Sequence, residues 1–134
     1  DDIWEPGKLE KLLDALKKQH AVMAYSDMSV IDETGAMRYK SLRHMRKGLR
    51  FVHGKGTTAY YLADNCAAGC SMLVRSEIVK KAMPFALGVY CDQWVAACAS
   101  AYGTVAFVPQ PLVRYRRHFG NQTKTLAAIG SRQD

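Results

Sequence analysis

The sequence predicts a single α/β domain. Segments with helical spacing alternate along the chain with short apolar, β-rich segments, which is the element order typical of α/β proteins. The 134 residues are 49% hydrophobic and 23% charged, within the range of globular proteins and far from that of disordered chains. A chain of this length buries roughly two thirds of its unfolded surface, so it can build a core without disulfides or a structural metal.

The first third of the chain predicts one helix followed by one interrupted strand. A helix is expected over Pro6–Gln19 because four leucines recur at the spacing of a single buried stripe: Leu9, Leu12, Leu13 and Leu16. The apolar run Ala21–Ser26 is too short for a helix and predicts a strand. We expect a break at Asp27, more extended chain over Met28–Ile31 and a turn at Asp32–Gly35.

The rest of the chain predicts further helices and strands in alternation. The expected helices cover Thr57–Ala63, Ser76–Lys81 and Gln93–Tyr102. The expected strands cover Cys70–Arg75, Thr104–Val108 and Leu112–Tyr115. Two prolines, Pro109 and Pro111, stand between the last two strands and predict a turn there.

Basic residues are concentrated in one part of the sequence. Nineteen Lys and Arg against 12 Asp and Glu give a net charge of +7, which favours an anionic partner. The strongest run, which we call the basic arm, covers residues 38–55 and holds seven Lys and Arg without any acid. Two interpretations stay open: a solvated loop or helix face, and a segment that contacts an anion. A polar tail follows over residues 121–134.

Three groups of residues have side chains that could support chemistry. Asp1 and Asp2 are adjacent carboxylates of the kind that bind Mg²⁺ or Mn²⁺, or else solvated acids at a chain end. Asp92 stands directly before an Ala-rich helix, where it could cap the helix or act as a general base. His118 follows the last expected strand in a basic and aromatic run, as a ligand or as an ordinary surface residue.

The sequence carries no sign of secretion or of a membrane span. It starts without a basic region, apolar core or cleavage site, so the four cysteines are expected to be free thiols in the cytoplasm. No apolar run approaches the roughly 20 residues that cross a bilayer. The abrupt start, with two acids and a tryptophan, suggests that the segment comes from the middle of a longer protein.

Six blocks of the sequence resemble family 2 glycosyltransferases of the rhamnosyltransferase-like kind, and they occur in the order found there. The resemblance covers nearly the whole chain. The blocks are Asp1–Leu9, Tyr25–Asp27, Asp32–Gly35, Asn65–Cys70, Asp92–Trp94 and Tyr115–Asn121.

This resemblance implies a GT-A fold, a mixed-sheet sandwich that binds a nucleotide sugar through a divalent metal, Mn²⁺ or Mg²⁺. The N-terminal nucleotide-binding half of that fold has no counterpart here, so residues 1–134 would be the C-terminal, catalytic-side part and inactive alone. Asp1 resembles the second acid of the metal motif and Asp2 the acid that follows it, while the first acid is missing. His118 matches a histidine that completes the metal shell in many GT-A enzymes.

The resemblance also implies roles for other residues. Asp92 matches the catalytic base, although Cys91 precedes it where relatives often have His or Glu. The Gly-containing loop that lines the donor sugar and the acceptor corresponds to Asn65–Cys70, with Asn65, Gly69 and Cys70 as its candidate binding residues. Trp94 and Arg116 are further candidates for substrate binding.

The expected function is therefore inverting sugar transfer from a nucleotide-sugar donor to a glycan or lipid-linked saccharide, in the synthesis of a surface polysaccharide. The expected place is the cytoplasm, with a peripheral contact at the inner face of the membrane as one option, and nucleic acid is not an expected partner. Two alternatives remain. One is a non-enzymatic basic module that binds polyanions, and the other is a catalytically silent transferase-like domain.

Overall fold

Two long strands, β2 (Met23–Ile31) and β5 (Val105–Arg116), lie parallel at the centre of a mixed sheet in the computed structural model, which describes residues 1–121. The sheet has five strands in the order β1-β5-β2-β3, and β4 also pairs with β2. The three short strands, all antiparallel to their neighbours, are β1 (Ile3–Trp4), β3 (Met37–Tyr39) and β4 (Met72–Val74). The predicted α/β class is confirmed.

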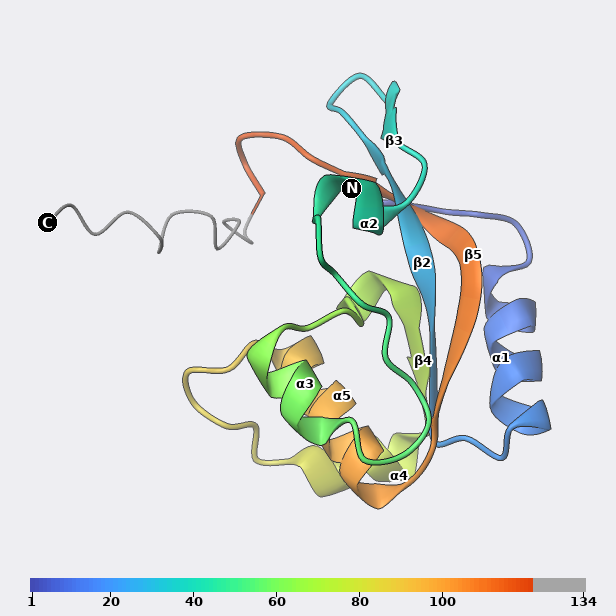
Figure 1. Cartoon of the computed structure of the whole chain (residues 1–134), viewed down its shortest axis with the longest axis vertical. Helices are drawn as coiled ribbons and strands as arrows, with labels where there is room; N and C mark the ends of the chain where they lie inside the picture. Colours follow the sequence, from blue (N-terminus) through green and yellow to red (C-terminus); the bar gives the residue numbers. More distant parts are fainter. Residues whose placement is uncertain (122–134) are drawn as a thin grey trace, which may run out of the picture.

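Helices cover both faces of this sheet (Figure 1). Helix α1 (Lys8–Lys18) lies on one face, and α3 (Thr58–Ala63), α4 (Ser76–Ala82) and α5 (Cys91–Tyr102) lie on the other. The short α2 (Leu42–Met45) lies inside the basic arm. The four helices predicted from sequence are therefore confirmed, with ends that differ by one or two residues.

Side chains of β2 alternate between the two resulting cores. Met23 and Tyr25 point to the α5 side, whereas Ala24 packs on the α1 side. Beyond Asp27 the alternation shifts by one residue, so that Met28 and Val30 also face the α5 side. The irregular pairing of β2 with β5 at Asp27 accounts for this shift, because an unpaired residue moves the following side chains to the other face.

Helix α1 buries only part of its predicted stripe. Leu12 and Leu16 are buried against the sheet, while Leu9 and Leu13 are exposed. The two buried leucines pack with small residues of β2 and β5, Ala24 and Ala106 among them. One pair of leucines therefore carries the contact between α1 and the sheet.

The predicted break at Asp27 and the predicted turn at Pro109–Pro111 are both wrong. β2 and β5 are each continuous, and the pairing changes register on both sides of Asp27, which lies opposite Pro111. The Asp27 carboxylate is buried and accepts hydrogen bonds from the N–H groups of Met28 and Leu42, at 2.6 and 3.1 Å. The Asp27 carboxylate thus supplies hydrogen-bond acceptors for these two N–H groups at the point where the prolines of β5 interrupt the regular hydrogen-bond ladder.

Several short elements also differ from the predictions. Strands β1 and β3 were not expected, although the turn at Asp32–Gly35 that precedes β3 is present. The expected strand over Cys70–Arg75 is shorter, because a 3-10 turn, η1 (Gly69–Ser71), replaces its start. Except for Asn121, the predicted polar tail lies outside the described residues.

Candidate functional site

The two ends of the described chain meet at one edge of the sheet. β1 pairs antiparallel with β5, with Ile3 opposite Arg114 and Trp4 opposite Val113. This pairing places Asp1 beside His118, and a carboxylate oxygen of Asp1 contacts Nε2 of the imidazole. The predicted proximity of these two residues is confirmed.

The ring of His118 is held from two sides. Its Nδ1 accepts a hydrogen bond from the N–H of Gly120 at 3.0 Å, and its backbone N–H donates to the Asn121 side chain. Because Nδ1 accepts, the proton of the neutral ring lies on Nε2, where it is donated to Asp1. His118 and Asp1 therefore form an acid–imidazole pair at the surface.

Asp2 faces inward, away from this pair. One of its carboxylate oxygens accepts the backbone N–H of Arg116 at 2.9 Å. The thiol of Cys70 lies close to the same carboxylate, and burial, together with this negative charge, raises the pKa of Cys70 to about 12. Cys70 is thus a protonated thiol at neutral pH and is not a nucleophile.

Lys8 is a buried lysine next to Asp2 that the sequence analysis missed. It is only 2% exposed, and its Nζ donates to the carbonyl of Cys70 at 2.6 Å and lies 3.4 Å from the centre of the Trp4 ring. Burial lowers the pKa of its ammonium group, and the nearby Cys70 and Asp2 oppose that shift. No sequence pattern indicated this role, because Lys8 reads as an ordinary first-turn residue of an amphipathic helix.

The guanidinium of Arg116 contacts backbone carbonyl groups instead of pointing into an exposed cavity. Its guanidinium donates to the carbonyl oxygens of Asp32, Glu33 and Asp1, at 3.0, 3.1 and 3.1 Å. The side chain therefore ties the end of β5 to the β2–β3 turn and to the start of the chain. The structure gives this predicted substrate-binding residue partners of its own, and a contact with substrate stays a prediction.

Asp92 lies in the first turn of α5 and faces η1. One oxygen of its carboxylate accepts the N–H of Gly69 at 3.0 Å, and the other accepts the N–H of Gln93 at 2.7 Å. A Cβ added to Gly69 would lie 3.5 Å from the Asp92 Cβ, an ordinary contact, so packing inside the chain does not require glycine here. The Asp92 carboxylate thus lies beside Gly69 of the loop that the family resemblance assigns to the donor sugar, and its role as a base stays a prediction.

These residues form a continuous polar group that runs from buried to exposed side chains, and we call it the polar junction. Asp92 contacts Gly69, the neighbouring Cys70 adjoins Lys8 and Asp2, and Asp2 is joined through Arg116 to Asp1 and His118. The members are Asp1, Asp2, Lys8, Gly69, Cys70, Asp92, Arg116 and His118.

Two other predicted substrate residues point elsewhere. The side-chain oxygen of Asn65 accepts the N–H of Ala67 at 3.0 Å, so this amide shapes its own loop. The indole N–H of Trp94 donates to the carbonyl of Ala82 at 2.8 Å and joins α5 to the end of α4. The polar atoms named here are engaged within the protein, and neither residue belongs to the polar junction.

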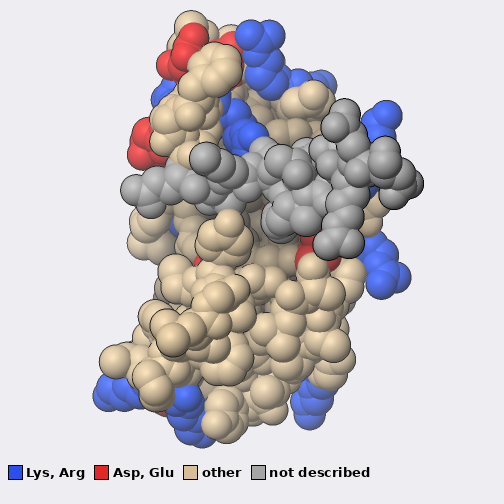
Figure 2. Space-filling view, turned by 90° about the vertical axis from the view of Figure 1, so that its left-hand side faces the viewer, with Lys and Arg blue, Asp and Glu red and all other residues tan. Residues whose placement is uncertain are grey.

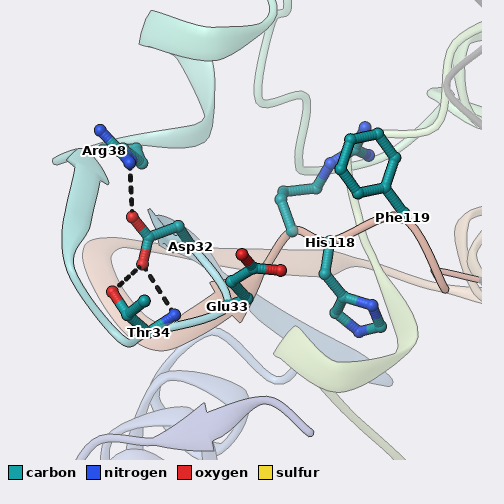
Figure 3. A pocket seen from close by; sticks show the side chains of 7 residues that line it. Asp32, Glu33, Thr34, Arg38, His118 and Phe119 are labelled. Carbon is teal, nitrogen blue, oxygen red and sulfur yellow. Dashed lines mark hydrogen bonds and ion pairs between the residues drawn. The ribbon is translucent and has the colours of Figure 1, made fainter.

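A pocket of about 450 Å³ opens beside His118 (Figure 3). Its wall combines the β2–β3 turn with the end of β5, and the Glu33 side chain points from the turn toward the side where His118 lies. Phe119 is fully exposed at the rim. The complete lining is Asp32, Glu33, Thr34, Arg38, Arg117, His118 and Phe119.

Asp32 gives this pocket a fixed negative group. Its carboxylate accepts the hydroxyl and the N–H of Thr34 and the N–H of Ala36, and it pairs with Arg38 at 2.6 Å. The Thr34 hydrogen bond is the main cause that lowers the pKa of Asp32 to about 2. Glu33 makes no side-chain hydrogen bond or ion pair with another described residue, so its carboxylate can accept from a ligand.

Most arginines of the basic arm are engaged within the protein. Arg38 pairs with Asp32, and Arg46 pairs with Asp64 and donates to the carbonyl of Asn65 at 3.0 Å. Two others lie over aromatic rings, Arg43 over Phe51 and Arg50 over Tyr60. The basic side chains of the arm stay exposed apart from Arg46, which is half-buried, so both interpretations of the arm stay predictions.

The donor atoms of Asp1 and His118 suit a divalent cation in kind and in position. Ligation through Nε2 would require the ring proton to lie on Nδ1, so the hydrogen bond from Gly120 would be lost. Asp2 has other partners, and within residues 1–121 no group of three or more His, Cys, Asp or Glu side chains lies close enough to hold a metal ion. Two ligands fit, and a complete set would need donors from outside these residues.

Comparisons with known proteins found no match: no family model, no curated protein and no solved structure is similar enough to this chain to be reported. Within the described residues, none of the helices has both the length and the apolar character needed to cross a membrane.

Proposed function

We propose that this chain is the catalytic side of an inverting glycosyltransferase with a GT-A fold, which transfers a sugar from a nucleotide-sugar donor to a glycan or lipid-linked saccharide. The observation that supports this most is the polar junction. The residues expected to bind metal stand at positions 1, 2 and 118 and the residue expected to act as base at position 92, yet all four belong to this one group of linked polar residues.

Asp92 would accept the proton of the acceptor's hydroxyl group while the oxygen of that hydroxyl attacks the anomeric carbon of the donor sugar. Its carboxylate accepts the N–H groups of Gly69 and Gln93, which fix its orientation. Attack from the face opposite the leaving group inverts the anomeric configuration.

Asp1 and His118 would hold the divalent cation, whose charge stabilises the departing nucleoside diphosphate when it is bound. Asp2 would support these two ligands without binding the cation itself, because its carboxylate accepts the backbone N–H of Arg116 and lies against Cys70. The pocket beside His118 offers the Glu33 carboxylate as a hydrogen-bond acceptor and the exposed ring of Phe119, a combination that suits a saccharide.

Two alternatives remain. A polyanion-binding module would find two cations of the basic arm, Arg38 and Arg46, already paired with acids, while the three lysines of the arm are exposed. A catalytically silent domain would keep the same contacts without turnover, so only an activity measurement separates it from an enzyme.

The test is a transfer assay on the full-length protein with a panel of nucleoside diphosphate sugars, Mn²⁺ and saccharide acceptors. We expect release of the nucleoside diphosphate, loss of activity with a chelator, and a product whose anomeric configuration by NMR is opposite to that of the donor. A product with retained configuration would contradict the proposal, as would salt-sensitive polyanion binding without any transfer.

A further inference from the structure

We propose that residues 83–90, which connect α4 to α5, form a lipid-contacting element that docks the protein on an anionic bilayer. We call this segment the apolar loop. Its side chains are exposed despite their apolar character: Leu87 is 100% exposed, and Met83, Phe85 and Tyr90 are exposed as well. This inference deepens the proposed function and rests on it for one point, that the acceptor is carried on a lipid.

The base of the apolar loop is held firmly, so its tip is displayed rather than buried. The indole of Trp94 joins α5 to the carbonyl of Ala82 at 2.8 Å, directly before the loop. On the other side, the amide of Gln93 donates to the carbonyl of Leu62 at 2.7 Å, and Leu62 adds a further exposed apolar side chain. Apolar groups fixed outside the core in this way mark a contact surface.

The charges around the loop favour an anionic bilayer as its partner. No acid occurs between Glu77 and Asp92, whereas Lys80 and Lys81 stand immediately before the loop. Figure 2 shows this face of the molecule: its lower half is largely uncharged, with Lys or Arg side chains at its lower edge. Apolar groups beside lysines are the combination by which peripheral proteins insert into anionic membranes.

Tyrosines lie where the interface of such a membrane would be. Tyr90 is exposed at the end of the loop, and Tyr102 is exposed beneath the ammonium group of Lys81, whose Nζ lies 4.4 Å from the ring centre. Tyrosine and lysine prefer the headgroup region, while leucine and phenylalanine enter the acyl region. Side chains that prefer the headgroup region therefore accompany the apolar side chains of the loop, a combination that favours a bilayer as the partner.

The position of the loop explains what docking would achieve. The loop ends at Tyr90, two residues before Asp92, whose carboxylate contacts Gly69. A bilayer that touches the loop would bring the hydroxyl of a lipid-carried acceptor next to this carboxylate. The basic arm is less suited to this role, because its arginines are engaged internally.

The experiment is co-sedimentation of the chain with vesicles of phosphatidylcholine alone or with about one quarter phosphatidylglycerol, at about 0.1 M and about 0.5 M NaCl. We expect binding to the anionic vesicles, and the double variant Phe85→Ser/Leu87→Ser should weaken the partition coefficient about tenfold or more. Lys80→Gln/Lys81→Gln should weaken binding several-fold and flatten its salt dependence.

The matched control is Leu9→Ser/Leu13→Ser, which changes two exposed leucines of α1 on the opposite face of the sheet (Figure 1). Binding of this variant should equal that of the unchanged chain. All variants should unfold at nearly the same temperature, because the altered side chains are exposed.

A second readout tests contact directly. Leu87→Trp should lose fluorescence on vesicles with brominated acyl chains, whereas Leu13→Trp should not. Equal vesicle binding by the loop variant and the unchanged chain would overturn the inference. So would a dimer in solution that the loop variant abolishes without any vesicle binding. Vesicle binding needs no sugar transfer, so a chain that binds vesicles through the loop and transfers nothing would overturn the proposed function alone.

Discussion

The polar junction and the basic arm are both rich in charge, but they form in opposite ways. The junction gathers residues from the two ends and the middle of the chain, because β1 pairs with β5 and η1 lies beside them. The arm is continuous in sequence, yet its arginines take separate partners: Asp32, Asp64 and two aromatic rings.

The difference teaches that charge density in a sequence and charge density in space are separate properties. A run of basic residues invites an interpretation as a binding surface, but each side chain can find its own partner after folding. Strand pairing, in contrast, brings together residues that no local pattern connects. The following changes test this contrast, starting with the largest expected effect.

Asp92→Asn should reduce turnover of the full-length protein by about 10² to 10⁴, the contribution of a general base, while donor affinity stays nearly unchanged. The amide oxygen of Asn can still accept from Gly69, so the fold should be kept. Steady-state kinetics give the answer, and Asp14→Asn on α1 is the control because that carboxylate pairs only with an exposed lysine in the described structure. Turnover close to that of the unchanged enzyme would reduce Asp92 to a helix cap.

Lys8→Ala should lower the free energy of unfolding by about 2 kcal/mol, because it removes a buried stem, the hydrogen bond to Cys70 and the contact with Trp4. Lys8→Met keeps the volume and should lose less. Urea unfolding measures both, with Lys17→Ala as a control on the exposed side of α1. An unchanged free energy of unfolding in Lys8→Ala would mean that Lys8 does not hold the junction together.

Arg46→Ala should lower the free energy of unfolding by about 1 kcal/mol, because the guanidinium joins the arm to Asp64 and to the carbonyl of Asn65. Within residues 1–121 its neighbour Lys47 is exposed and has no such partner, so Lys47→Ala should change stability by less than about half a kcal/mol. Equal effects of the two substitutions would break the contrast, since the arm would then behave as one solvated face.

The smallest expected effect is on the stability of the fold at acid pH. The pKa of Asp32 is lowered from 3.8 to about 2 in the folded protein. Its ionised form therefore stabilises the fold at any pH above the pKa that Asp32 has in the unfolded chain. That stabilisation is present above about pH 4 and is lost as the pH falls toward about 2. In Asp32→Asn the thermal midpoint should change less over this interval than in the unchanged chain, as measured by circular dichroism. Identical acid profiles would show that the β2–β3 turn does not depend on the charge.

The sequence predicted the class of fold and four helices because their periodicity is local. It failed where two strands determine each other: Asp27 and Pro109–Pro111 both look like breaks, but they face the same irregularity in a continuous pair. In the site, the approach of Asp1 to His118 and of Asp92 to Gly69 was predicted through family resemblance. The burial of Lys8 was not, because only tertiary packing decides which face of the first turn of α1 is covered.

The parallel pairing of β2 with β5 also has a consequence for the order of events during synthesis. Met23 pairs with Val105 and Ile31 with Arg116, so β2 leaves the ribosome long before its central partner exists. Contacts between such distant segments form slowly, since a long loop must close first. A nascent chain that stops short of residue 105 can pair β2 only with the short strands β3 and β4, and the edge that β5 covers stays open. We expect such a chain to depend on chaperones until the last strand arrives.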